Sequence, residues 1–140
     1  MSSFGKIILI SLCFTIGLTI GCGSDGNKMK ISGTVTFSDD GSPLTTGTVM
    51  MTSSTKYVRG DLNDKGEYSL GELKDGDGVP LGEYRVSICG AYEATLPDPP
   101  YSTPSYIHAK YESPDRSGLK FEVKKDGPKT FDIKVDRPGK

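Results

Sequence analysis

The sequence is poor in the groups on which most catalytic and nucleic-acid-binding sites depend. It holds one histidine and three cysteines, and 17 lysines and arginines stand against 18 aspartates and glutamates, for a net charge of −1. Proteins that bind nucleic acid usually carry a strong basic excess, so this balance argues against such a partner. No G-x-S-x-G motif accompanies the single histidine, which argues against a hydrolase with a serine nucleophile.

The sequence also lacks a hydrophobic run long enough to cross a bilayer comfortably. The apolar stretch 7–20 has 14 residues, whereas a hydrocarbon core of about 30 Å needs about 20 in a helix. That length suits the hydrophobic region of a secretory signal. The run ends at Gly21-Cys22 and resembles a bacterial lipobox, in which the cysteine is lipidated and becomes the mature N-terminus. Thr19 stands where leucine is usual.

We therefore expect residues 1–21 to be a lipoprotein signal peptide and Cys22 to be the lipidation site, carrying acyl chains such as palmitate. Ordinary signal cleavage and a retained anchor are the alternatives. Residues 22–29 are small, polar or charged, and we expect them to form a flexible tether. The folded domain would then occupy residues 30–138, close to the membrane surface.

The cysteines do not form the even set that a secreted disulfide scaffold needs. Cys13 would leave with the signal peptide, and Cys89 would remain as the one cysteine of the domain. We expect Cys89 to be a free thiol, so the fold must depend on its hydrophobic core. If Cys22 is not lipidated, a Cys22–Cys89 bridge or an intermolecular bridge becomes an alternative.

Long helical periods are absent, and the 18 glycines and nine prolines indicate many turns between short strands. Period-2 alternation or a β-branched composition predicts eight strands at roughly ten-residue spacing. They are expected at residues 31–37, 48–53, 57–59, 67–70, 83–88, 107–111, 119–123 and 131–135. This pattern predicts an all-β fold, an antiparallel Greek-key β-sandwich of about seven to eight strands.

Two stretches organise the predicted fold, because each couples a turn to an alternating strand. Residues 61–66 offer the Asn, Asp and Gly chemistry of a chain reversal, and residues 67–70 then alternate. A second corner at residues 80–82 precedes the alternation at 83–88. The predicted core comprises Val35, Phe37, Tyr68, Tyr84, Val86, Ile88, Phe121 and Ile133.

Several of these segments together resemble a known domain family. Residues 31–36 look like its opening strand and residues 40–44 like the following turn. Residues 64–68 match a D-x-G-x-Y turn, and residues 82–86 match a G-x-Y-x-V strand. The chain is similar here to the carboxypeptidase regulatory-like domains, which have a transthyretin-like fold. The resemblance implies a non-catalytic accessory module, found beside peptidases or alone at cell envelopes.

One turn partly fits a calcium-binding loop. Asp61, Asn63 and Glu72 have a spacing that could supply oxygen ligands, but Lys65 stands where another oxygen ligand belongs and the flanks are predicted strands. The turn chemistry alone accounts for these residues, so the sequence predicts no metal site. Asp75 and Asp77 lie in a glycine-rich loop that shares the same two interpretations.

Two further segments hold candidate functional residues. The segment 91–105 is rich in proline and is predicted to be a surface loop. Tyr92, Tyr101 and Tyr106 could form an aromatic contact patch there for a sugar or a protein, or could pack against the edge of the sandwich. His108 is predicted to be a partly exposed residue of the strand 107–111, rather than a catalytic base.

The sequence thus predicts an envelope-anchored lipoprotein whose domain is a non-catalytic interaction or structural module, with no catalytic residue and no cofactor. A carbohydrate- or calcium-dependent binding module is the alternative, and a hydrolase is least favoured. The expected partners are the membrane, through the lipid anchor, and an envelope protein or polysaccharide. The oligomeric state is left open.

Overall fold

The computed structural model describes residues 27–93 and 103–139. Within these residues the chain forms nine β-strands, one short 3-10 helix and no α-helix, so the predicted all-β class is confirmed. The elements are β1 (Lys28–Met29), β2 (Ser32–Phe37), β3 (Thr48–Thr52), β4 (Tyr57–Asp61), β5 (Glu67–Ser69), β6 (Val79–Pro80), β7 (Gly82–Cys89), η1 (Ala109–Glu112), β8 (Lys120–Val123) and β9 (Ile133–Val135).

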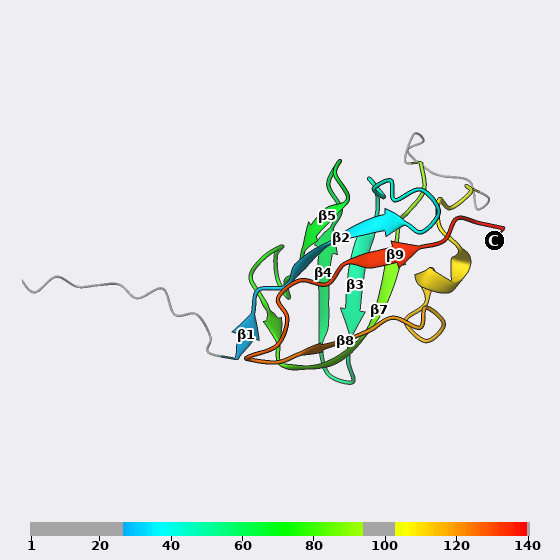
Figure 1. The fold of residues 1–140 in the computed structure, drawn as a ribbon. Helices are drawn as coiled ribbons and strands as arrows, with labels where there is room; N and C mark the ends of the chain where they lie inside the picture. The colour runs from blue at the N-terminus through cyan, green and yellow to red at the C-terminus, as the bar shows by residue number, and fades with distance from the viewer. Residues whose placement is uncertain (1–26, 94–102, 140) are drawn as a thin grey trace, which may run out of the picture.

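The strands form two main layers with a small additional sheet (Figure 1). One layer has the order β4-β3-β7-β8 and is antiparallel throughout. The other has the order β5-β2-β9, and β1 pairs with β6 in a two-stranded sheet. The strands β2 and β9 run parallel, with Val35 opposite Ile133, which differs from the fully antiparallel expectation. Alternation marks only which face is buried and is the same for both strand directions.

The core lies between the two layers and is built from alternate residues of each long strand. Along β7, Tyr84, Val86 and Ile88 are buried, while Glu83 and Arg85 are exposed. All eight predicted core residues are buried, which confirms the register assigned to their strands. The remaining large buried side chains include Ile31, Leu44, Met51, Leu70, Ile107 and Tyr111.

In place of the strand expected at residues 107–111, residues 109–112 form the 3-10 helix η1. Ile107 and Tyr111 are buried, but Ala109 is exposed, so the predicted alternation is wrong here. His108 ends the extended segment and accepts a hydrogen bond from the Lys110 N–H through Nδ1 at 3.1 Å. Buried residues four positions apart fit a helical turn as well as a strand, and the sequence spacing alone did not separate the two.

The ordered sheet begins earlier than the predicted domain boundary at residue 30. Lys28 pairs with Pro80 and Met29 with Val79, although the sequence places residues 28 and 29 in the tether and residues 79 and 80 in a loop or turn. Val79 is fully buried. A ladder of two residues is too short to show alternation, so the pairing leaves no signal in the sequence.

In the described part of the chain, no helix combines the length and hydropathy that crossing a membrane would require.

Hydrogen bonds to Asp136 fasten the C-terminal segment to η1. The Asp136 carboxylate accepts hydrogen bonds from Ser38 Oγ at 2.6 Å, Lys110 Nζ at 2.7 Å and Tyr111 OH at 2.9 Å. The Lys110 ammonium first, and then the two hydroxyls, hold the pKa of Asp136 well below its ordinary value. These bonds join three segments that are far apart in sequence.

We expect this arrangement to make stability depend on acidity. A carboxyl group whose pKa is lowered on folding stabilises the fold above its unfolded pKa of about 3.9, and this contribution is lost as the pH falls below that value. The Tm of the wild type should therefore fall more steeply between neutral pH and about pH 3 than that of Asp136→Asn. Circular dichroism melts across this range check the prediction.

The comparison isolates Asp136 because other lowered carboxyl groups remain in both proteins. Hydrogen bonds from Ser42, for example, lower the pKa of Asp40 to about 2, and this contribution cancels in the difference. Parallel Tm curves for the two proteins would show that the Asp136 contacts do not stabilise the fold.

Candidate functional site

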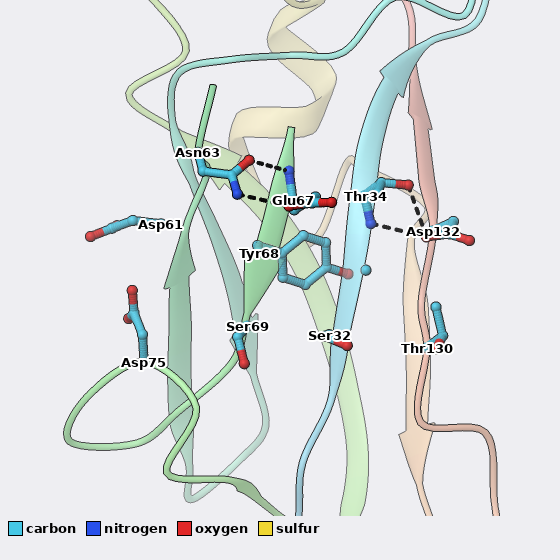
Figure 2. A pocket seen from close by; sticks show the side chains of 11 residues that line it. Ser32, Thr34, Asp61, Asn63, Glu67, Tyr68, Ser69, Asp75, Thr130 and Asp132 are labelled. Carbon is cyan, nitrogen blue, oxygen red and sulfur yellow. Dashed lines mark hydrogen bonds between the residues drawn. The ribbon is translucent and has the colours of Figure 1, made fainter. Parts of the chain in front are cut away.

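An open hollow of about 550 Å³ lies over the outer face of β2 and β5. Figure 2 shows Asp61 and Asp75 on one side of Tyr68, with Thr34 and Asp132 on the other. The hollow collects side chains from β2, β5, the end of β4, the loop after β5 and the segment before β9. Its lining residues are Ser32, Gly33, Thr34, Asp61, Asn63, Glu67, Tyr68, Ser69, Asp75, Thr130 and Asp132.

The parallel pairing of β2 with the C-terminal segment builds one wall of the hollow. Thr34 donates two hydrogen bonds to Asp132 Oδ1, from its backbone N–H and its hydroxyl, each at 2.9 Å. Ser32 forms a parallel bridge with Thr130. Because alternate residues of β2 point outward, the hydroxyls of Ser32 and Thr34 share this face.

The turn between β4 and β5 builds the opposite wall. Asn63 Oδ1 accepts hydrogen bonds from the backbone N–H groups of Lys65 and Glu67, each at 2.9 Å, and its Nδ2 donates to Glu67 Oε2 at 2.9 Å. Gly66 has a φ of +73°, which the reversal requires. Asp61 Oδ1 accepts a hydrogen bond from Thr48 Oγ1 at 2.7 Å. The expected turn is therefore present, and its side chains are mutually bonded.

Tyr68 lines the hollow, and its side chain is buried and hydrogen-bonded within the fold. It is 4% exposed, and its hydroxyl donates a 2.5 Å hydrogen bond to the Phe131 carbonyl. Burial, and then the Asp132 carboxylate, raise the pKa of Tyr68 well above its ordinary value. The phenol is thus neutral at physiological pH and already has an acceptor, so it is a poor acid or base for catalysis.

The lining is acidic and rich in hydroxyl groups. Four carboxylates face four hydroxyl side chains of serine and threonine, and the lining residues include no lysine, arginine or histidine. Such a surface can accept hydrogen bonds from sugar hydroxyls or ammonium groups.

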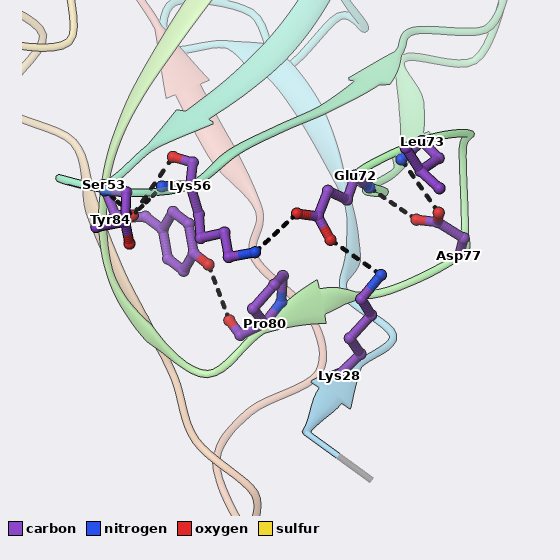
Figure 3. Close-up of polar contacts among 9 residues, drawn as sticks. Lys28, Ser53, Lys56, Glu72, Leu73, Asp77, Pro80 and Tyr84 are labelled. Carbon is purple, nitrogen blue, oxygen red and sulfur yellow. Dashed lines mark hydrogen bonds and ion pairs between the residues drawn. The ribbon is translucent and has the colours of Figure 1, made fainter. Parts of the chain in front are cut away.

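The three residues that partly fit a calcium-binding loop, Asp61, Asn63 and Glu72, do not lie together in the structure. Asp61 and Asn63 line the hollow, as Asp75 does, but Glu72 does not. Glu72 lies between two lysines (Figure 3), with Lys28 Nζ at 2.9 Å and Lys56 Nζ at 3.1 Å. Hydrogen bonds from these lysines lower the pKa of Glu72. Across the described ranges 27–93 and 103–139, no group of three or more histidine, cysteine, aspartate and glutamate side chains could hold a metal ion.

Two of the three tyrosines of the predicted contact patch lie where the proline-rich loop leaves and rejoins the domain. Tyr92 forms an antiparallel bridge with Ser105, and the Tyr106 N–H donates to the Ala91 carbonyl at 2.7 Å. Tyr106 is 40% exposed. Tyr101 lies outside the described residues, as do the prolines 97–100 and the lipidation candidate Cys22.

The two remaining side chains with catalytic potential are those of His108 and Cys89. His108 Nδ1 caps η1. Cys89 is a half-buried free thiol whose pKa is raised, first by burial and then by the Glu112 carboxylate. A raised thiol pKa keeps the nucleophilic thiolate scarce at neutral pH.

The sequence did not indicate the wall formed by Thr130 and Asp132. The outward position of Ser32 and Thr34 was readable from alternation in the first strand. Their neighbours on the other strand follow only from the parallel register, which joins residues about 98 positions apart, as in the Thr34–Asp132 contact.

Neither the known protein families nor the curated proteins compared with this chain give a match. Among solved structures, the chain is similar to the major pilin subunit of Bacillus cereus, with 14% identity and a TM-score of 0.49 over 79% of this chain and 30% of the pilin. It is also similar to a 9R-lipoxygenase from Cyanothece, with 17% identity and a TM-score of 0.36 over 77% of this chain and 16% of the enzyme. The chain therefore spans less than a third of either protein.

Proposed function

We propose that this chain is a cell-envelope lipoprotein, anchored through a lipidated Cys22, whose β-sandwich is a non-catalytic interaction or structural module. The observation that carries the non-catalytic part is that the groups a catalyst would use are engaged in the fold. His108 caps η1, and the Tyr68 hydroxyl donates to a backbone carbonyl. Cys89 has a raised pKa that disfavours its reactive thiolate.

The sequence supports the anchored location and the domain type. The apolar run before Gly21-Cys22 resembles a lipobox, and the turn-and-strand segments at residues 64–68 and 82–86 resemble those of carboxypeptidase regulatory-like domains. Such modules occur beside peptidases or alone at cell envelopes. The partners we propose are the membrane, through the anchor, and an envelope protein or polysaccharide.

The decisive experiment is the mass of the mature protein. After production in a bacterium and extraction from its envelope, the chain should begin at Cys22 and carry acyl mass. A Cys22→Ser chain should lack that mass and leave the membrane fraction, because the cysteine sulfur bears the lipid. Intact-mass spectrometry of both proteins measures this. A mature chain that begins elsewhere and carries no acyl group would remove the anchor from the proposal.

The hollow favours a second candidate function, a carbohydrate-binding module. Its carboxylates and hydroxyls form an open polar surface of the kind that hydrogen-bonds sugar hydroxyls. This candidate differs from the first in requiring saturable binding of an oligosaccharide to the domain. Titration calorimetry with soluble cell-wall oligosaccharides distinguishes the two.

A further inference from the structure

The exposed large hydrophobic side chains gather at one end of the sandwich. Four are exposed among the described residues: Tyr57, Leu73, Leu81 and Tyr106. The first three belong to the end that contains β1 and the beginning of β7, which we call the proximal end. Single exposed hydrophobic residues are ordinary, but three of four at one end call for a physical explanation.

Contacts place each of the three at the proximal end. The Leu81 N–H donates to the Asn27 carbonyl at 3.2 Å, so Leu81 lies where the described chain begins. Tyr57 pairs with Thr52, which in turn pairs with Arg85 near the start of β7. Leu73 follows Glu72, whose carboxylate binds the lysines of β1 and of the β3–β4 turn.

Leu73 is held in solvent by a well-bonded loop. It is 89% exposed, yet Asp77 accepts hydrogen bonds from the N–H groups of Glu72 at 2.7 Å and Leu73 at 3.1 Å. Figure 3 shows these bonds between Asp77 and the backbone of the loop. A Cβ on Gly71 would lie 1.7 Å from the Lys74 carbonyl oxygen, so the loop is also tightly closed. Exposure of a leucine side chain to water is unfavourable, and its transfer into an apolar environment would lower the free energy.

Chain length brings the proximal end close to the proposed anchor. Cys22 precedes Asn27 by five residues, and five residues span at most about 18 Å when fully extended. The eight residues of β7 place the opposite end about 26 Å farther away. That distal end holds Tyr106, and Figure 1 shows β1 and η1 at opposite ends of the domain.

The charges at the proximal end are compatible with phospholipid headgroups. Lys28, Lys56 and Lys74 lie on the segments that meet there, and the Glu72 carboxylate is paired with two of them. The Asp77 carboxylate bonds the backbone of its own loop, and Asp75 lines the hollow on the sheet face. Together with the exposed Glu83 of β7, these groups give the proximal end both signs of charge, which a zwitterionic headgroup layer can accommodate.

We infer that the proximal end lies on the lipid surface, with Leu73, Leu81 and Tyr57 at the headgroup boundary. This inference rests on the proposed lipid anchor at Cys22 and adds a fixed orientation of the domain to it. The distal end, with Tyr92 and Tyr106, then points away from the membrane. The bilayer that holds the anchor, rather than a protein partner, covers these three exposed side chains.

Tryptophan fluorescence tests the orientation directly, because the natural sequence contains no tryptophan. Leu73→Trp and the distal control Tyr106→Trp each introduce a single reporter at an exposed position. The acylated proteins are placed in phosphatidylcholine vesicles whose acyl chains carry bromine. Interfacial side chains reach about 5–10 Å into the boundary region, so bromine should quench the reporter at position 73 and leave that at position 106 nearly unchanged.

Each outcome supports or overturns the inference. Fractional quenching at position 73 at least about twice that at position 106 supports it. Equal quenching at both positions, or none at either, in proteins of confirmed acyl mass overturns the inference and leaves the anchor intact. An absence of quenching at both positions would favour a protein partner on Leu73. A mature chain without acyl mass overturns the anchor itself, and the orientation with it.

Discussion

Replacement of Val86 by aspartate is expected to unfold the domain. Val86 lies in the middle of β7, is fully buried and pairs with Met51 of β3. An aspartate there would place a carboxylate without a partner inside the core, at a cost of several kcal/mol even after its pKa rises. Domains of this size are usually stable by only about 5–15 kcal/mol. Loss of the β-sheet circular dichroism spectrum and of a cooperative melt would show the effect.

Arg85→Ala is the matched control on the neighbouring residue. Arg85 points outward from β7 and forms an ion pair with Asp115, and both side chains are substantially exposed. Such pairs usually contribute about 1 kcal/mol or less, so the control should melt within a few degrees of the wild type. If both variants were equally damaging, the alternation assigned to β7 would be wrong.

Gly33→Ala is expected to be nearly as damaging, although it adds one methyl group. The new Cβ would lie 2.0 Å from the carbonyl oxygen of Phe131, which accepts the Tyr68 hydroxyl hydrogen bond. The obstacle is backbone, so β2 and the segment before β9 must separate. Overpacking usually costs about 1–3 kcal/mol, and we expect the upper end or more. Denaturant unfolding gives the loss directly.

Gly127→Ala provides the control for the loss of a glycine. Its added Cβ would lie 3.1 Å from the Cβ of Lys124, so the turn at residues 124–127 would have to shift by only a few tenths of an ångström. Removal of a glycine also stabilises by restricting the unfolded chain, so this variant should stay close to the wild type. A Gly33→Ala protein as stable as Gly127→Ala would mean that β2 and β9 do not approach as described.

The two predictions differ in what a reader of the sequence could foresee. The burial of Val86 follows from the alternation at residues 83–88, because only one register puts the three apolar side chains on a common face. The intolerance at Gly33 does not follow, since a glycine within a strand pattern has several explanations. It depends on Phe131, which approaches Gly33 only when the parallel pair forms.

One wall of the candidate site could likewise be predicted from the sequence, and the other could not. The side-chain chemistry of Asn63 and Gly66 was enough to predict the turn that forms one wall, because those bonds close over four residues. The wall that contains Asp132 depends on contacts across nearly a hundred residues. No local pattern encodes such a distance. Glu72 fitted a ligand spacing in the sequence, but two lysines from other segments are its actual partners.

The sequence by itself determined the all-β class, the turns and the buried face of each long strand, because these follow from period-2 alternation and local turn chemistry. Tertiary structure decided the parallel direction of β9, the short β1–β6 ladder and the helical form of residues 109–112. In each of these cases the local pattern allowed two conformations, and packing against distant segments selected one. The hollow and the proximal hydrophobic end exist only through that selection, because their residues come from segments that meet only in the folded chain.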